Sequence, residues 1–324
     1  MPLRAIRIVS AGPLATIQDW GRYGFQDRGV PVSGAMDREA LGIGNSLVGN
    51  AASEAAVEIT LGGFSAEFLR SVLFAVTGAD LSARLNGSPL SCWAPHPAHG
   101  GDVLTLDQRQ SGCRAYLTVA GGIDVPVVMG SKSTYLLGGF GGFQGRRLQS
   151  GDVLECGEPQ GPTLSGWPAE LIPCYRADPV LRVVPGPQDQ AVTSQGWNRF
   201  LTGEYRLTER SDRMGCVLEG PIITHRHGAD IISDGTACGA VQVPGNGQPI
   251  VLLADRQTVG GYAKIATVVS CDLPLLAQLV PGDLVRFTTV DLWQAREIHL
   301  RRAYQLRQAL HRLKARSPDD KPHS

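Results

Sequence analysis

The chain has 324 residues, more than a single hydrophobic core usually organises, so two packed units are expected. Hydrophobic residues make up 43% and charged residues 19% of it, without a long apolar run, which excludes a disordered chain and a membrane span. Thirty basic residues balance thirty acidic ones, so the chain lacks the positive field that favours binding to nucleic acids or anionic membranes. The expected partners are small molecules and proteins.

The start of the chain and the cysteines indicate its compartment. Met1-Pro2-Leu3-Arg4 leads directly into an alternating strand pattern and lacks the apolar core of a secretory signal. The seven cysteines are scattered singly without a CxxC pair, which argues against a disulfide framework and a structural zinc site. The histidine pairs at 96 and 99 and at 225 and 227 lack an evident third ligand. We therefore expect a cytoplasmic protein with reduced thiols and no metal.

Short apolar runs dominate the chain, punctuated by 40 glycines and 21 prolines. Runs rich in Val, Ile, Leu and Thr between such turns are typical of many short strands, so a mainly β fold of barrels or sandwiches is predicted. The predicted strands cover residues 6–10, 56–61, 72–77, 103–106, 115–120, 181–184, 240–243, 250–253, 266–270 and 284–288. Few of them alternate with helices, which argues against a doubly wound sheet.

Few helices are predicted. Asp37 is expected to cap a helix that runs to about Val48, and Asp272 to open a short one through Leu279. After Asp291, apolar residues recur at spacings of three and four, typical of an amphipathic helix. They are Leu292, Ala295, Ile298, Ala303, Leu306, Leu310 and Leu313. Arginines occupy most of the other face, which we interpret as solvated, with a basic docking surface as the alternative.

Proline and glycine cluster at 158–173 without hydrophobic alternation, which predicts a break between two halves. We assign 1–165 to an N-terminal half, 166–290 to a C-terminal half, 291–316 to the last helix and 317–324 to a disordered tail. Both halves place Gly-Asp turns before apolar strands and Val-Pro turns before paired glycines. This repetition indicates a faint internal duplication, with coincidence in a glycine-rich chain as the alternative.

The first polar segment among glycines is 18–37. Its turns bring Asp19, Arg22, Ser33 and Asp37 close in sequence to exposed backbone N–H groups, which bind carboxylates and carbonyls. The arginine fork adds selectivity for a carboxylate. The alternative is structural, with an ion pair between Asp19 and Arg22 and a helix cap at Asp37.

Two further segments of this kind, 211–215 and 239–262, lie in the C-terminal half. In the second, five polar residues follow the apolar strand 250–253, where a loop would display donors and acceptors at a barrel rim: Asp255, Arg256, Gln257, Thr258 and Tyr262. The polar residues of interest are Arg213, Gln242, Asp255, Arg256, Gln257, Thr258 and Tyr262. Because ligand sites commonly form where domains meet, we expect the polar residues of both halves to form one site for a small polar molecule. Ion pairs between the neighbours Asp212 and Arg213, and between Asp255 and Arg256, are the structural alternative.

No familiar catalytic motif accompanies these segments. Gly130-Ser131-Lys132-Ser133 resembles the end of a phosphate loop, but Val125 replaces the required glycine. The glycine spacings of a dinucleotide site and of a nucleophile elbow are also missing, and no lysine lies beside a methionine as in a biotin carrier. We therefore expect neither a nucleotide site nor biotin attachment in this chain, and we assign no catalytic residue.

Four segments, in this order, resemble the family that includes allophanate hydrolase subunit 2, biotin-dependent carboxyltransferase domains, KipA-like proteins and the C subunit of bacterial 5-oxoprolinase. They read QDWGRYGFQDRGVPVSGAMD at 18–37, GGIDVPVVMGSKST at 121–134, SDRMG at 211–215 and GAVQVPGNGQPIVLLADRQTVGGYAKIATV at 239–268. The resemblance extends over roughly residues 4–288. It implies two tandem cyclophilin-like β-barrel domains, in agreement with the mainly β, two-unit prediction.

The resemblance implies three alternative functions. In 5-oxoprolinase, the C subunit works with a KipI-like B subunit and a LamB/YcsF-like A subunit in the ATP-dependent opening of 5-oxo-L-proline to L-glutamate. In urea carboxylase, the similar domain moves a carboxyl group from carboxybiotin to urea, and KipA-like regulators antagonise an inhibitor of a sporulation kinase. A free-standing chain without a biotin site favours the role in 5-oxoprolinase, a lactam hydrolase that is active only as a multi-subunit complex, with ATP expected on a partner.

Overall fold

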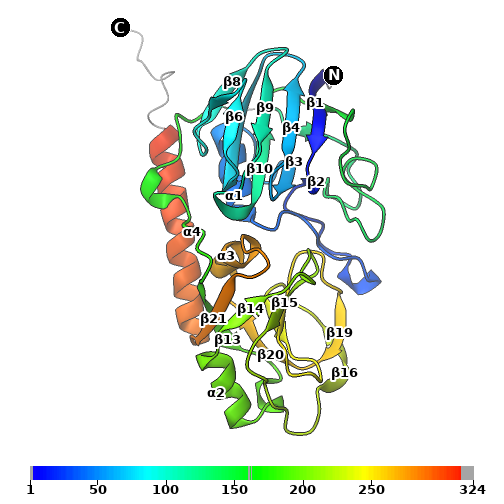
Figure 1. The fold of residues 1–324 in the computed structure, drawn as a ribbon, viewed down its shortest axis with the longest axis vertical. Coiled ribbons are helices and arrows are strands. Elements are labelled where there is room, and N and C mark those ends of the chain that lie inside the picture. The colour runs from blue at the N-terminus through cyan, green and yellow to red at the C-terminus, as the bar shows by residue number, and fades with distance from the viewer. Residues whose placement is uncertain (1–2, 160, 162, 315–324) are drawn as a thin grey trace. The chain divides into compact units, whose positions relative to one another are not determined.

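The computed structural model describes residues 3–159, 161 and 163–314, and the chain forms two compact units. Unit 1 consists of Met1–Arg22, Ser33–Cys174 and Gln305–Ser324. Unit 2 consists of Tyr23–Val32 and Tyr175–Tyr304. The tail predicted at 317–324 lies outside the described residues. Figure 1 identifies the elements of both units by label and by position in the chain.

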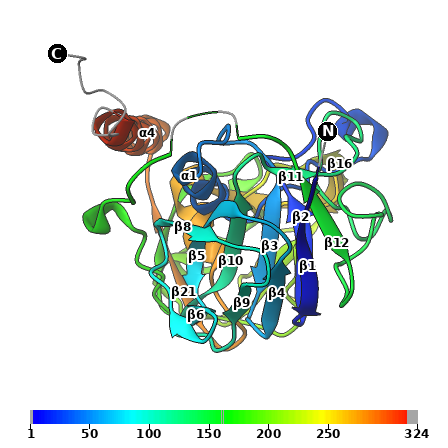
Figure 2. The same cartoon turned by 90° about the horizontal axis from the view of Figure 1, so that it is seen from above.

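Unit 1 contains two antiparallel sheets, most of whose strands are labelled in Figure 2. The seven-stranded sheet has the order β11 (Ile123–Asp124), β12 (Val153–Cys156), β1 (Leu3–Ala11), β4 (Phe64–Phe68), β9 (Val103–Leu106), β6 (Ala83–Leu85) and β7 (Ser88–Pro89). The five-stranded sheet has the order β2 (Leu14–Gln18), β3 (Ala56–Thr60), β10 (Ser111–Val119), β5 (Val72–Asp80) and β8 (Pro95–Ala98).

One hydrophobic core joins the two sheets of unit 1. Phe68 of one sheet and Phe74 of the other are fully buried, and their ring centroids lie 4.8 Å apart. Residues of β4 alternate between buried and partly exposed, as expected for a strand with one face in a core. The helix α1 (Arg38–Leu47) packs on β5 and β10, and the carboxylate of Asp37 caps it by accepting the N–H of Ala40.

Unit 2 contains a closed barrel. Its strand order is β13 (Val180–Pro185), β20 (Lys264–Val268), β17 (Ala240–Gln242), β18 (Ile250–Leu252), β15 (Gly215–Glu219), β14 (Tyr205–Leu207) and β21 (Leu284–Thr289). The parallel pairing of β13 with β21 closes it. A separate two-stranded ribbon joins β16 (Asp230–Gly235) to β19 (Val259–Tyr262). The stacked rings of Phe200 and Phe287, 4.5 Å apart, fill part of this unit's core.

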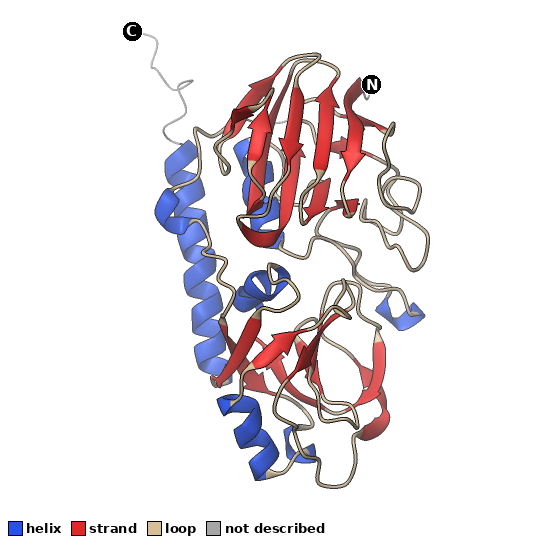
Figure 3. Cartoon of the chain, viewed as in Figure 1, coloured by secondary structure: helices blue, strands red, loops and turns tan. Residues whose placement is uncertain are grey.

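Strands outnumber helices (Figure 3), so the predicted mainly β fold is confirmed, and strands occur at all ten predicted positions. The helix α2 (Ser194–Thr202) was not predicted, because its sequence includes Gly196. That glycine is needed, since a Cβ there would lie 2.7 Å from the carbonyl oxygen of Thr224. Four short 3-10 turns lie at Gln26–Arg28, Ala169–Leu171, Asp189–Ala191 and Ser270–Asp272.

The last two helices, α3 (Leu273–Ala277) and α4 (Leu292–Lys314), begin near the predicted residues but differ in detail. Asp272 precedes α3, yet its carboxylate binds Arg182 rather than capping the helix. Asp291 and Gln294 cap α4 reciprocally, each accepting the other's N–H at 2.9 and 2.8 Å. Leu292 is exposed, so the covered face of α4 begins one turn later than predicted. None of the helices in the described part of the chain combines the length and apolar character needed to span a membrane.

Candidate functional site

The predicted site residues fall into one group in each unit. The N-terminal cluster consists of Asp19, Arg22, Ser33 and Asp37, all in unit 1. The C-terminal cluster, in unit 2, consists of Arg213, Gln242, Asp255, Arg256, Gln257, Thr258 and Tyr262.

The carboxylate of Asp19 organises the turn at Ser131–Ser133. It accepts the N–H of Gly21 at 2.6 Å, the N–H of Lys132 at 2.6 Å and the hydroxyl of Ser131 at 2.7 Å. The hydroxyl of Ser133 donates to the same carboxylate. Since a carboxylate offers about four acceptor positions, Asp19 is saturated by the protein itself. Its observed role is to fix this turn against the segment that follows β2.

The guanidinium of Arg22 lies in the interior of unit 1. It donates to the carbonyl oxygen of Ser133 and stacks over the ring of Phe140, with 4.9 Å to the centroid. Gly141 makes this packing feasible, because it has a φ of +73° and a Cβ there would lie 2.7 Å from the guanidinium. Asp19 and Arg22 therefore converge on one residue, Ser133, through its hydroxyl and its carbonyl respectively.

Ser33 is a buried hydroxyl beside this network. It has a φ of +55° and full burial, and its Oγ has no hydrogen-bond partner among the described residues. The following residues pack closely on the Asp19 segment: a Cβ on Gly34 would lie 2.7 Å from the nitrogen of Gly21, and Ala35 N–H donates to the carbonyl of Asp19 at 2.8 Å. Ser33 thus lies next to the segment that carries Asp19 and Arg22.

Asp37 makes its hydrogen bonds in a different part of unit 1. Besides the cap that its carboxylate provides to α1, its N–H donates to the hydroxyl of Tyr116 at 2.7 Å, which donates in turn to the carboxylate of Glu58 at 2.8 Å. Burial, and then the charge of Glu58, raises the pKa of Tyr116 well above its ordinary value, so this hydroxyl stays protonated. The predicted helix cap is confirmed, and the side chain of Asp37 is used for it.

Three residues of the turn, Ser131, Lys132 and Ser133, are part of the polar network but were not predicted as site residues. The amine of Lys132 forms an ion pair with Glu54 at 2.8 Å and also donates to the carbonyl of Ile123 at 3.0 Å. A signal for them existed, because they belong to the segment 121–134 that resembles the family. They were considered only for their resemblance to a phosphate loop, which the missing glycine excluded.

Arg213 and Asp255 form a buried ion pair in unit 2. Nε and Nη2 of the arginine donate to the two carboxylate oxygens at 2.8 and 3.2 Å, a bidentate arrangement. The N–H of Asp255 also donates to the carbonyl of Arg213 at 2.9 Å. Asp212 instead accepts the N–H groups of Met214 and Gly215. A structural ion pair was among the alternatives, but Arg213 finds its partner in Asp255 rather than in its sequence neighbour.

Arg256, Gln257 and Thr258 form a loop held by Thr236 of the neighbouring segment. Arg256 donates to the carbonyls of Leu253 at 3.2 Å and Thr236 at 3.4 Å. The hydroxyl of Thr236 donates to the carbonyl of Gln257, and its N–H donates to the carbonyl of Thr258 at 3.0 Å. These bonds fix the backbone of the loop that carries the predicted polar side chains.

The amides of Gln242 and Gln257 meet beside this loop. Nε2 of Gln257 donates to Oε1 of Gln242 at 3.3 Å, and Gln242 approaches the carbonyl of Tyr262 at 3.5 Å. Gly260 is needed here, because a Cβ would lie 2.6 Å from Nε2 of Gln242. The side chain of Tyr262 is exposed, so it faces solvent from the end of β19. Gln242, Gln257 and Tyr262 are thus close together.

Lys264 is a further cation that the sequence did not single out. Its side chain is only 5% exposed, and its amine pairs with Asp234 at 2.9 Å. This hydrogen bond from Lys264 is the main cause of the lowered pKa of Asp234. Lys264 follows Tyr262 by two residues and pairs in register with Gln242, so unit 2 places a buried ammonium beside the C-terminal cluster.

The two clusters contain polar groups but no recognisable catalytic set, and the carboxylates of Asp19 and Asp37 are already used within unit 1. Guanidinium, ammonium, amide and hydroxyl groups suit a small molecule that carries a carboxylate and a carbonyl. Among residues 3–159, 161 and 163–314, no three His, Cys, Asp or Glu side chains lie together as a metal site would require. The structure does not assign a nucleophile or a general base.

Comparison with known proteins identifies the family. Residues 28–289 match the family described as carboxyltransferase domain, subdomain A and B. The chain belongs to this family. The matched range includes Ser33, Asp37 and the whole C-terminal cluster, whereas Asp19 and Arg22 precede it.

Several relatives of this carboxyltransferase-domain chain carry the name of an enzyme. It is 41% identical over 290 residues to the C subunit of 5-oxoprolinase from Escherichia coli, a match to 90% of this chain and 93% of that protein. It is 36% identical over 293 residues to the C subunit of 5-oxoprolinase from Haemophilus influenzae, covering 90% and 94%. Urea amidolyase of Lachancea kluyveri is 31% identical over 317 residues, but this match covers only 17% of that longer protein.

Solved structures confirm the fold of the family. Urea amidolyase of Kluyveromyces lactis superposes with a TM-score of 0.89 at 29% identity, covering 94% of this chain and 20% of that one. The urea carboxylase of the same yeast gives 0.87 at 28% identity, covering 100% and 30%. The chain thus corresponds to a minor part of each urea enzyme and to nearly the full length of the bacterial proteins.

Proposed function

We propose that the chain is the C subunit of a heteromeric, ATP-dependent 5-oxoprolinase that opens 5-oxo-L-proline to L-glutamate. The observation that carries the proposal is the 41% identity to the Escherichia coli protein, which extends over 93% of its length. The proposed partners are a KipI-like B subunit and a LamB/YcsF-like A subunit, with ATP bound by a partner. The cytoplasm is the proposed compartment.

The chemistry of the substrate agrees with the groups that the chain provides. Ring opening adds water across the lactam C–N bond: the water oxygen joins the carbonyl carbon, and the ring nitrogen leaves as an amine. Resonance makes this slow near neutral pH, so the carbonyl oxygen needs activation and its developing charge needs donors. We assign substrate binding to the C-terminal cluster, with Arg256 and Lys264 as the cations suited to the substrate carboxylate. Asp19 and Arg22 position the Ser131–Ser133 turn.

The proposal is tested by reconstitution from purified proteins. The chain is mixed with the KipI-like and LamB/YcsF-like proteins, and ATP-dependent release of glutamate from 5-oxoproline is measured. We expect activity from the full mixture and none from the chain alone, because the lactam needs activation by ATP. Turnover by the chain alone would contradict the division of labour, and an inactive full mixture would contradict the proposed reaction.

A carboxyltransferase function is the second candidate, supported by the TM-score of 0.89 to a urea amidolyase. It requires carboxybiotin from a separate carrier. Urea-dependent consumption of carboxybiotin in the presence of this chain, without oxoprolinase activity in the full mixture, would favour it. A KipA-like regulator would instead bind its inhibitor partner without turning over either substrate.

A further inference from the structure

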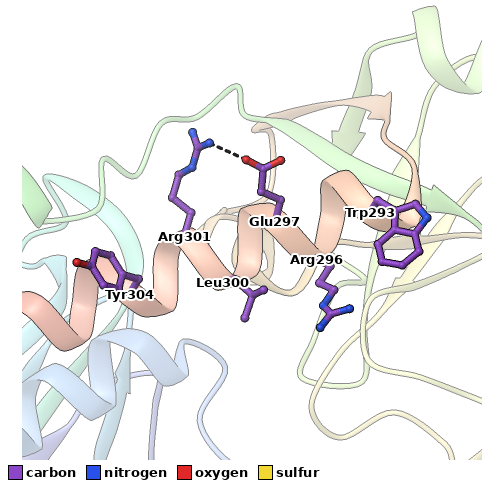
Figure 4. A pocket seen from close by; sticks show the side chains of 6 residues that line it. All are labelled: Trp293, Arg296, Glu297, Leu300, Arg301 and Tyr304. Carbon is purple, nitrogen blue, oxygen red and sulfur yellow. Dashed lines mark hydrogen bonds and ion pairs between the residues drawn. The ribbon is translucent and has the colours of Figure 1, made fainter.

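The helix α4 exposes a second apolar stripe on the side away from its partly buried residues. The stripe consists of Trp293, Leu300 and Tyr304, whose exposed fractions are 75%, 54% and 63%. Spacings of seven and eleven residues at about 100° per residue place the three within roughly 40° of one another over about 16 Å of helix. Figure 4 shows Trp293, Leu300 and Tyr304 along this helix.

The stripe lines a shallow, open part of the surface of this helix. Arg296, Glu297 and Arg301 complete its lining. Glu297 and Arg301 form an ion pair at 2.8 Å and flank the stripe on the side away from Arg296 (Figure 4). Arg296 flanks the stripe beside Trp293 and Leu300. The surface is therefore apolar along its centre, with Arg296 at one edge and the ion pair of Glu297 and Arg301 at the other.

The other side of α4 packs against the protein, so the stripe is not needed to stabilise the helix. Ala309 is buried, and Ala295, Ile298 and Leu306 are partly buried. These residues form the apolar face expected from the sequence, so the helix does not need Trp293, Leu300 and Tyr304 for its own packing. Large, closely spaced apolar side chains on a helix surface are typical of an interaction site.

The charge of α4 indicates which kind of partner would bind the stripe. Five arginines, Arg296, Arg301, Arg302, Arg307 and Arg312, accompany a single acidic residue, Glu297. A second copy of the chain would bring two basic helices together, which like-charge repulsion opposes. An acidic partner would instead gain from complementary charge.

The helix also lies beyond residues 28–289, the range that matches the carboxyltransferase-domain family.

We infer that the stripe of Trp293, Leu300 and Tyr304, with Arg296 beside it, docks an acidic amphipathic helix of a partner protein. The partner's apolar residues would pack on Trp293, Leu300 and Tyr304, and its carboxylates would face Arg296 and Arg307. This inference rests on the proposed function, which requires an assembly. Beyond the proposed function, it specifies which surface of this chain contacts a partner subunit. It also specifies that the matching surface of the partner is apolar and acidic.

The test measures binding of the full-length chain to the purified KipI-like and LamB/YcsF-like proteins by isothermal titration calorimetry. We expect Trp293→Ala and Leu300→Ala each to weaken binding to one of these proteins at least tenfold. Arg296→Glu should do the same and reduce the dependence of the dissociation constant on salt. Matched controls are Leu137→Ala, an exposed apolar residue of unit 1, and Arg147→Glu, an exposed arginine there; both should bind as the unchanged chain does.

The outcomes separate this inference from the proposed function. If the unchanged chain binds but the α4 variants bind equally well, the docking surface is wrong and the proposed function stands. If the chain binds neither protein, separately or mixed, both fall. If sedimentation shows that the chain dimerises and Trp293→Ala abolishes the dimer, a second copy occupies the stripe and the inference is overturned. Because the substituted side chains are exposed, circular dichroism and thermal unfolding should show an unchanged fold.

Discussion

Arg213 and Asp255 face each other through two hydrogen bonds of 2.8 and 3.2 Å, with side chains only 6% and 7% exposed. They lie 42 residues apart in sequence, just before β15 and just after β18. The antiparallel register of these strands, with Gly215 opposite Leu252, brings them together. This burial makes the pair part of the interior of unit 2, in addition to any role in ligand binding.

Removing one partner of this pair should destabilise the protein strongly. Arg213→Met leaves the carboxylate of Asp255 buried without its counter-charge, so we expect the free energy of unfolding to fall by about 3–5 kcal/mol. The double variant Arg213→Met with Asp255→Leu should recover most of the loss, because no charge then remains buried. Urea denaturation measures both. A change below about 1 kcal/mol in the single variant would show that water reaches the pair.

The carboxylate of Asp19 should control the order of the turn at Ser131–Ser133. Asp19→Asn keeps the shape but replaces one acceptor oxygen by a donor amide, which faces either the N–H of Lys132 or the hydroxyls. We expect a loss of about 1–3 kcal/mol in stability and faster amide hydrogen exchange at Lys132. The matched control is Asp27→Asn, an exposed carboxylate that should change neither quantity. Unchanged exchange at Lys132 would mean that other contacts hold the turn.

Local features of the fold were predictable from the sequence because they depend on neighbouring residues. The alternation in β4 and the cap at Asp37 are decided within a few positions, and apolar runs marked the strands at all ten predicted positions. The covered face of α4 was predicted from the spacing of its apolar residues, with Leu292 as the exception. The exposed stripe was not predicted, because the other face was assigned to arginines.

Partnerships across long distances in sequence were not predictable. The pairing of Asp19 with Ser131, 112 residues away, depends on how β2 lies in its sheet and on the path of the loop that follows β11. The same holds for Lys264 and Asp234, whose contact follows from the fold of unit 2. Residue types therefore indicated polar segments correctly, whereas the partner of each charge required the structure. The predicted halves, 1–165 and 166–290, stay a prediction, as does a single site formed by residues of both.

The cysteines should differ widely in reactivity. Burial, followed by the charge of Asp80, raises the pKa of Cys92 to about 11. A raised pKa keeps the thiol protonated, so at pH 8 only about one molecule in a thousand carries the reactive thiolate there. Cys174 is exposed. We expect iodoacetamide at pH 8 to modify Cys174 first, as followed by peptide mass spectrometry. The rate at Cys92 should rise about tenfold per pH unit until the pH reaches its pKa, and equal rates at pH 8 would contradict the burial of Cys92.

Arg256 offers the most direct test of the C-terminal cluster. Its side chain bonds the carbonyls of Leu253 and Thr236, and it lies in the loop that also carries Gln257 and Thr258. If its guanidinium also contacts the substrate carboxylate, Arg256→Ala removes a charge-assisted hydrogen bond of about 1.5–3 kcal/mol. We therefore expect the activity of the reconstituted complex, or the affinity for its ligand, to fall more than tenfold while the fold survives.

The conservative variant separates binding from local structure. Arg256→Lys keeps the charge but loses the planar fork, so it should recover little activity if the contact is bidentate. Lys264→Met is the companion variant, because it removes the other cation beside the cluster. Steady-state kinetics of the complex and thermal unfolding of each variant provide the measurements. Unchanged kinetics in Arg256→Ala would remove this arginine from the site. A loss of activity that follows loss of thermal stability would instead assign it a structural role in the loop.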